Sequence, residues 1–178
     1  MEFYIIISLV IIIVLYIFIT YNKLVKYKNL VSEAFSTMDV YLKKRWDLVP
    51  NLVNVVKNFA SHEKEIFEKI TKLRTNNYQN MTTNKKIDVN KQLDEDISKI
   101  IIIVENYPEL RANETFLQLN NELSKIEDEI ANSRKYYNGT VRVLNNTIHM
   151  FPNNIVAKLF GFQKADMFQA NIEEKKIM

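Results

Sequence analysis

The fold of this chain is decided by residues 1–21, which read MEFYIIISLVIIIVLYIFITY. From Phe3 to Tyr21 the stretch contains no charged residue. A helix of about 19 residues, rising 1.5 Å per residue, covers roughly the 30 Å hydrocarbon core of a bilayer. The sequence therefore predicts a helix that spans a membrane.

A cleaved signal peptide is the alternative interpretation of this stretch. Such a peptide has a basic start, an apolar region of about 7 to 15 residues and a small-residue cleavage site. Here Glu2 follows Met1, and no Ala-x-Ala sequence follows the span. We therefore expect a retained single-pass anchor over residues 1–22, in the cell membrane. Lys23, Lys26 and Lys28 follow it directly, so the positive-inside rule places the N-terminus outside and the rest of the chain in the cytoplasm.

The rest of the chain has the composition of one helical domain. Roughly 155 residues are enough for a domain with its own core. The chain has 2 glycines and 3 prolines, which favours long helices and excludes a glycine-rich phosphate-binding loop. It has no cysteine, which excludes disulfides, thiolate metal sites and a cysteine nucleophile. A net charge of +3 does not indicate nucleic acid as a partner.

Apolar residues recur every three or four positions in four segments, which predicts four helices. The segments are residues 22–57, 62–78, 89–106 and 114–151. Pro50 predicts a kink or break in the first helix, and Asn113 is a candidate N-cap for the last. Ile100 to Val104 is apolar on every side, so we expect it to be deeply buried. Residues 163–178 are expected to form a mobile, charged tail.

Several blocks of sequence are distinctive when taken together. They read YNKLV at 21–25, VSEAFSTMDVYLKKRWDLVPNLV at 31–53, YPELRANETFLQL at 107–119 and FPNNIVAKLFGF at 151–162. In this order they resemble the LemA family of single-span bacterial membrane proteins. The resemblance implies an all-α fold in which the transmembrane helix continues into an antiparallel, bromodomain-like four-helix bundle over residues 23–162. It implies no established enzyme activity.

Four asparagines are candidates for setting the helix register. Asn22 and Asn29 lie one heptad apart on the first helix, and Asn138 and Asn145 lie one heptad apart on the last. If these helices pack antiparallel, Asn22 faces Asn145 and Asn29 faces Asn138. Buried Asn pairs fix register at a cost in stability. This packing also returns residues 155–162 to the bilayer, where an amphipathic segment can lie in the interface. The alternative is that asparagine is simply common in this chain.

The candidate interaction residues form two groups. They are Asp39, Lys43, Arg45, Trp46 and Asp47 in the first helix, and Phe160 and Phe162 near the end. The charged residues form either intramolecular ion pairs, with Asp39 and Lys43 at the right spacing for one, or a partner-facing patch. The aromatic residues either pack inside the bundle or contact a partner. His62 and His149 do not have the spacing of a helical zinc site, so we expect no metal. Nothing in the sequence indicates an enclosed carboxylate pair, so we also expect no catalytic residue, and we expect no cofactor.

The sequence favours a non-enzymatic, membrane-anchored scaffold that binds another, unidentified protein at the cytoplasmic face. The anchor would raise the effective concentration of weak contacts. A second hypothesis is a lipid-contacting membrane organiser that self-assembles into homo-oligomers. A third is an accessory to an envelope protease or hydrolase, which no nucleophile, metal or phosphate motif supports.

Overall fold

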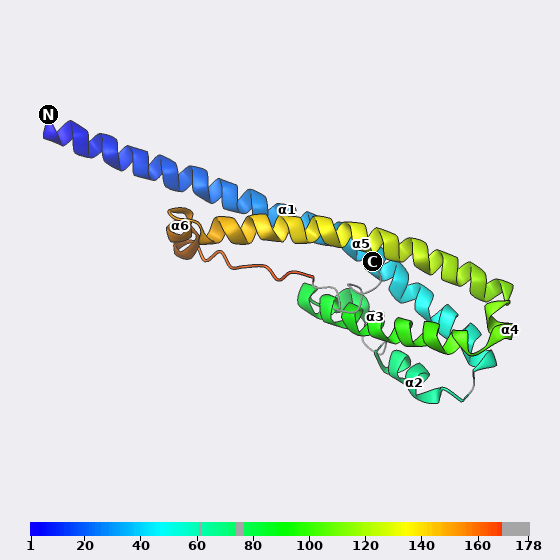
Figure 1. Ribbon diagram of the computed structural model, residues 1–178. Coiled ribbons are helices and arrows are strands. Elements are labelled where there is room, and N and C mark those ends of the chain that lie inside the picture. The colour runs from blue at the N-terminus through cyan, green and yellow to red at the C-terminus, as the bar shows by residue number, and fades with distance from the viewer. Residues whose placement is uncertain (61, 74–76, 169–178) are drawn as a thin grey trace. The chain divides into compact units, whose positions relative to one another are not determined.

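The computed structural model describes residues 1–60, 62–73 and 77–168 (Figure 1). Every regular element in these ranges is a helix, which confirms the predicted all-α class. The elements are α1 (Glu2–Phe59), α2 (Lys64–Leu73), the 3-10 helix η1 (Tyr78–Asn80), α3 (Thr83–Glu105), α4 (Pro108–Arg111), α5 (Glu114–His149) and α6 (Asn153–Leu159). They divide into two compact units. Unit 1 comprises residues 1–36 and 135–167, and unit 2 comprises residues 37–134 and the chain from 168 onward.

Helix α1 runs without interruption from the apolar stretch into the domain, as the sequence predicts. It also passes through Pro50, so of the predicted kink or break the break is wrong. Proline inside a helix costs about 3 kcal/mol. The aliphatic residues around it are all buried: Leu48, Val49, Leu52 and Val53. Each such side chain contributes roughly 1.5–3 kcal/mol when buried, so packing outweighs the missing hydrogen bond.

The apolar part of α1 has the properties of a membrane-spanning segment. In the described part of the chain, α1 is the one helix long and apolar enough to cross a membrane. Only 6% of its most apolar 18-residue window is buried. A core helix of a soluble protein would be mostly covered, so the exposure of this window agrees with a lipid environment.

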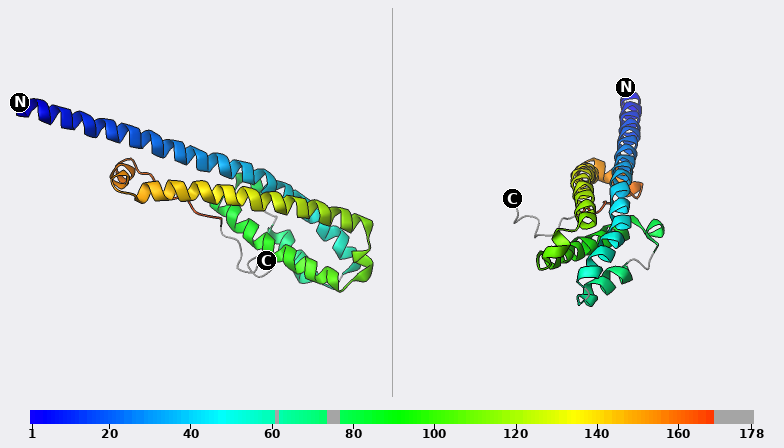
Figure 2. Two further views of the ribbon diagram at one scale, coloured as in Figure 1. Left: turned by 45° about the horizontal axis from the view of Figure 1, so that its top comes forward. Right: turned by 90° about the vertical axis from the view of Figure 1, so that its right-hand side faces the viewer.

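In unit 2, the later part of α1 packs with α2, α3 and the first part of α5 around a core of aliphatic and aromatic side chains (Figure 2). Residues Ile100 to Val104 do not lie entirely within this core, which corrects the prediction of deep burial. Ile100 and Val104 are buried, but Ile102 is 60% exposed. Positions four residues apart share one face of a helix, whereas a position two residues away points elsewhere.

The helix boundaries follow local capping as well as periodicity. The backbone N–H of Phe116 donates to Asn113 Oδ1 at 3.0 Å, which confirms the predicted cap of α5. Helix α3 begins earlier than the predicted residue 89, because the Thr82 hydroxyl accepts from the Lys85 N–H at 3.3 Å. Helix α2 ends at Leu73, before the predicted residue 78.

In unit 1, the last part of α5 runs alongside α1 in the opposite direction (Figure 1, Figure 2). The rings of Phe35 and Tyr137 lie 5.7 Å apart, centroid to centroid. Nearer the start of the chain, the Tyr16 hydroxyl donates to Asn153 Oδ1 at 2.7 Å. Low residue numbers on α1 therefore face high numbers beyond α5, and the antiparallel packing predicted for these helices is correct.

Candidate functional site

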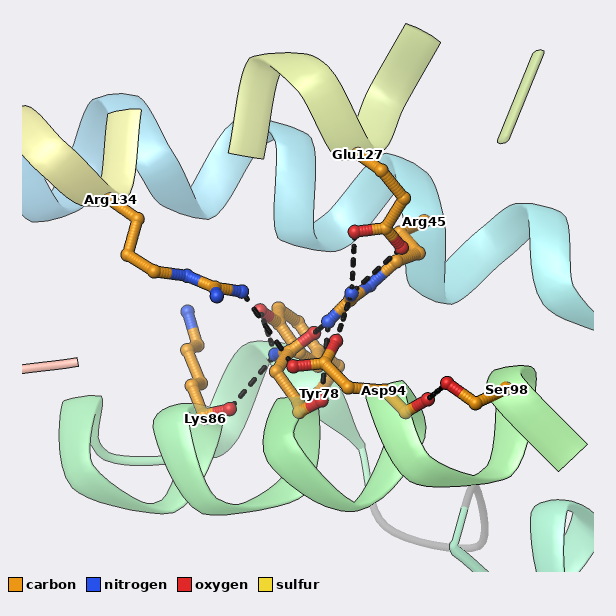
Figure 3. Close-up of polar contacts among 8 residues, drawn as sticks. Arg45, Tyr78, Lys86, Asp94, Ser98, Glu127 and Arg134 are labelled. Carbon is orange, nitrogen blue, oxygen red and sulfur yellow. Dashed lines mark hydrogen bonds and ion pairs between the residues drawn. The ribbon is translucent and has the colours of Figure 1, made fainter. Parts of the chain in front are cut away.

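The guanidinium of Arg45 lies at the polar centre of unit 2 (Figure 3). Its side chain is 0% exposed. It donates from Nη1 to both carboxylate oxygens of Glu127, at 2.8 and 3.0 Å, and from Nη2 to Asn90 Oδ1 at 2.8 Å. It also pairs with Asp94. Since these partners belong to α3 and α5, one side chain of α1 ties three helices together.

The charge of Arg45 is held by its carboxylate partners. Burial lowers the pKa of Arg45, but Asp94 and Glu127 together raise it by more, so the pKa lies above its ordinary value. Arg134 adds a second cation, with its Nη2 3.6 Å from Asp94 Oδ2. The guanidinium and both carboxylates are engaged with one another, so this centre is suited to bracing helices rather than to proton transfer.

A second polar group connects Asp39 to η1 and α3. Asp39 accepts a hydrogen bond from the Tyr78 hydroxyl at 2.8 Å and pairs with Lys86. Burial and the Asp39 charge raise the pKa of Tyr78. Of the two alternatives for these charged residues, the structure contains intramolecular ion pairs, but with other partners than the Asp39–Lys43 spacing indicated: Asp39 pairs with Lys86 and Lys43 with Asp47. The attraction between Asp39 and the partly buried Lys86 on α3 is less screened by water than an attraction to Lys43, one turn away on the surface, would be.

Two of the predicted interaction residues are core residues. Arg45 is fully buried, and Trp46 is 4% exposed with its ring centroid 5.2 Å from that of Tyr78. The alternative in which these two side chains face a partner is wrong for this structure. Asp47 is exposed, and the Lys43 side chain is 36% exposed.

An open groove of about 710 Å³ lies between α1 and α5 in unit 2. Leu48 and Ile126 are its buried aliphatic residues. Its other lining residues are Tyr41, Lys44, Asp47, Asn51, Glu122, Lys125 and Glu129. Sequence reasoning found only Asp47 among these. The α5 side has a signal in its spacing, because positions 122, 125, 126 and 129 share one helical face.

The asparagines do not form the predicted pairs. Asn22 and Asn29 are exposed, and the Asn22 amide donates to the Phe18 carbonyl of its own helix at 3.0 Å. Asn145 instead donates to the Ala165 carbonyl at 2.9 Å and accepts from the Ala165 N–H at 3.0 Å. Asn138 is half-buried. An amide side chain has an N–H group and a carbonyl oxygen side by side, which can pair with the C=O and N–H of one backbone residue, so the returning chain replaces the expected asparagine partner.

This returning chain corrects the prediction of a mobile tail from residue 163. In unit 1, the Tyr137 hydroxyl donates to the Asp166 carbonyl at 2.8 Å. In unit 2, Phe168 is buried with its ring centroid 4.5 Å from the Arg134 guanidinium carbon. Residues 163–168 are thus held by specific contacts, and the predicted tail from 169 to 178 lies outside the described residues.

Phe160 and Phe162 contact α1 within unit 1. Their ring centroids lie 4.8 and 5.8 Å from that of Tyr21. Phe162 is half-buried and Phe160 is 48% exposed. These rings were expected either to pack within the bundle or to contact a partner, and in the structure they pack against the chain's own α1. Both rings lie at the end of the charge-free stretch.

No three His, Cys, Asp or Glu side chains within the described ranges are placed to hold a metal ion. The buried carboxylate of Asp96 accepts from Lys69 Nζ at 2.7 Å. This hydrogen bond raises the pKa of Lys69. The Asp96 carboxylate and the Lys69 ammonium therefore form an ion pair.

A helix with an exposed apolar stretch of bilayer length continues into an all-α fold, which is the architecture of a membrane-anchored helical-bundle protein. The model of the LemA family matches residues 34–178, and the chain belongs to the LemA family. It is similar to Protein LemA of Metamycoplasma hominis, with 27% identity over 156 residues that cover 86% of this chain and 71% of that protein. It is also similar to Magnetosome protein MamQ 2 of Paramagnetospirillum magneticum, with 24% identity over 178 residues. That match covers 84% of this chain but 64% of MamQ 2, which is less than two thirds of its length.

Proposed function

We propose that this protein is a non-enzymatic scaffold that α1 anchors in the membrane and that binds another protein through the groove between α1 and α5. The groove is the observation that carries the proposal. It combines buried Leu48 and Ile126 with surrounding charges of both signs. An apolar centre with a polar rim is the usual anatomy of a protein-binding surface.

The shape of the groove favours a helical partner. Its α1 side extends from Tyr41 to Asn51, which is about 15 Å of helix at 1.5 Å per residue. An amphipathic helix of about three turns matches this length and would lay its apolar face over Leu48 and Ile126. Lys44 and Lys125 can pair with acids on such a helix, and Glu122 and Glu129 with bases.

The buried polar centre supports a groove of fixed width. Arg45 follows the groove residue Lys44 on α1, and its partner Glu127 follows the groove residue Ile126 on α5. The contact between Arg45 Nη1 and both carboxylate oxygens of Glu127 therefore joins the two helices that line the groove. A preorganised surface loses less conformational entropy when it binds.

The cytoplasmic face is part of the same proposal. Lys23, Lys26 and Lys28 follow the span, and a positive bias at this end favours retention of the bundle in the cytoplasm. Confinement to the membrane would raise the effective concentration of a weak partner in the same bilayer. The engagement of Arg45 with Asp94 and Glu127 supports a structural rather than a catalytic role for the polar centre.

Photo-crosslinking from the groove tests the proposal, because the chain has no cysteine of its own. Lys44→Cys places a benzophenone label in the groove of the full chain in native membranes. Lys85→Cys is the control, because Lys85 is an exposed lysine on α3 that does not line the groove. We expect an adduct with one other protein from position 44, no such adduct from position 85, and loss of the adduct when Lys125→Glu reverses a groove charge.

Equal adducts from both positions, or an adduct that survives Lys125→Glu, would contradict the groove as the binding surface. Adducts only with a second copy of the chain or with lipid would favour the second function, a self-assembling membrane organiser. An impermeant maleimide applied to intact cells gives the topology in the same strains. Labelling of Lys85→Cys from outside would contradict the cytoplasmic placement.

A further inference from the structure

Helix α6 is fixed next to the end of the membrane-spanning stretch. The Tyr16 hydroxyl contacts Asn153 at the start of α6, and the Tyr21 ring packs against Phe160 just after it. α6, drawn in orange in Figure 1, therefore lies alongside the end of the charge-free stretch, from Tyr16 to Tyr21. This five-residue step is about 7.5 Å long at 1.5 Å per residue.

One side of α6 carries exposed apolar side chains. Ile155 and Leu159, four residues apart on the same face, are 59% and 68% exposed. Phe151, in the turn before the helix, is 79% exposed. Val156 and Ala157, on the same helix, are buried. Packing within unit 1 therefore uses one face of α6 and leaves a second apolar face uncovered.

The charge of unit 1 differs from that of the chain as a whole. Unit 1 contains 7 Lys or Arg residues and 3 Asp or Glu residues. The basic residues are Lys23, Lys26, Lys28, Lys135, Arg142, Lys158 and Lys164. One of the acids is Glu2, before the span. Unit 2 contains 17 basic and 18 acidic residues, so the positive surplus of the chain lies in the unit that contains the span.

We propose that α6 lies in the interface of the bilayer that α1 spans, with Phe151, Ile155 and Leu159 among the acyl chains and Lys158 at anionic headgroups. Interfacial helices bury their apolar face by about 5–10 Å, which matches the 7.5 Å step beside α6. The two ends of α6 are held to the span, by Asn153 on Tyr16 and by Phe160 on Tyr21. Phe160 and Phe162, in contrast, use their rings to hold α6 to α1.

This arrangement gives the chain two membrane contacts, a spanning helix and a short interfacial one. Basic residues near a membrane surface are attracted to anionic lipids over about a Debye length. Two contacts on different helices of unit 1 would restrict its tilt against the bilayer. The inference depends on α1 spanning the membrane and is independent of the proposed scaffold function.

Depth-dependent fluorescence quenching tests the proposal on the full chain. Ile155→Cys is labelled with an environment-sensitive fluorophore and reconstituted into vesicles of phosphatidylcholine and phosphatidylglycerol. Ile102→Cys is the matched control, because Ile102 is an isoleucine on α3 that is 60% exposed and belongs to unit 2, whereas α6 and the span belong to unit 1. Leu159→Cys provides a second position on α6. Circular dichroism of each labelled protein verifies that its helices are retained.

We expect the fluorescence emission of labels at positions 155 and 159 to shift to the blue and to be quenched by lipids that carry a doxyl group near the headgroup. The label at position 102 should be quenched only by aqueous iodide. Iodide quenching at 155 and 159 equal to that at 102 would place the face in water and overturn the proposal. Protection from both quenchers would also overturn it, because a protein surface would then cover the face.

Discussion

Replacement of Arg45 by methionine should lower the free energy of unfolding of unit 2 by about 3 kcal/mol. Methionine retains most of the buried stem but removes the guanidinium that Asp94, Glu127 and Asn90 contact. Removal of one partner of a buried ion pair costs about 3–5 kcal/mol, because the other charge stays buried without compensation. We take the lower limit, because the Glu127 side chain is 36% exposed and can recover water.

Thermal unfolding of the full chain in detergent micelles, followed by circular dichroism at 222 nm, measures this effect. A loss of about 3 kcal/mol corresponds to a decrease in Tm of roughly 6 to 12 °C for a chain of this size. Lys44→Met is the matched control, since it makes the same substitution at the preceding, exposed residue. A surface substitution of this kind should stay within about 0.5 kcal/mol of the natural chain.

A further variant separates charge from packing. If the loss comes from carboxylates left without a cation, Asp94→Asn and Glu127→Gln added to Arg45→Met should recover a large part of the decrease in Tm. An Arg45→Met protein that unfolds at the same temperature as Lys44→Met would refute the reasoning. A triple variant no more stable than Arg45→Met would show that packing, and not charge, sets the cost.

Three other predictions concern hydrogen bonds of single side chains. Because burial and then Asp39 raise the pKa of Tyr78, the folded state keeps a proton that the unfolded state releases near pH 10. Stability from this group is complete below pH 10 and declines above it, so the urea midpoint of Tyr78→Phe should fall less between pH 8 and pH 11 than that of the natural chain. Asn145→Ala removes both hydrogen bonds to Ala165 and should accelerate hydrogen exchange at the backbone N–H of Ala165. An unchanged exchange rate at Ala165 would show that this contact does not form in solution. Asn113→Ala removes the cap of α5 and should cost about 1 kcal/mol in thermal unfolding, whereas Asn113→Asp should retain most of the stability.

The sequence by itself determined the elements that depend on local pattern. A charge-free stretch of bilayer length specifies an apolar helix wherever it occurs, and apolar spacing of three and four specifies the buried face of α5. The cap at Asn113 was also visible, because its partner is three residues away. Pro50 was the exception, since its local penalty was offset by packing that the sequence alone does not reveal.

Only the tertiary structure decided the partners of the polar and aromatic side chains. The five candidates between Asp39 and Asp47 looked alike in sequence, yet Arg45 and Trp46 are core residues and Asp47 lies at a groove. Glu127, the partner of Arg45, is 82 residues away, and Ala165, the partner of Asn145, is 20 residues away. Periodicity shows which face of a helix is apolar, but it contains no information about which distant group a polar side chain of that helix will contact. That choice depends on how helices pack, because a buried charge or amide is stable only where a complementary group is already in place.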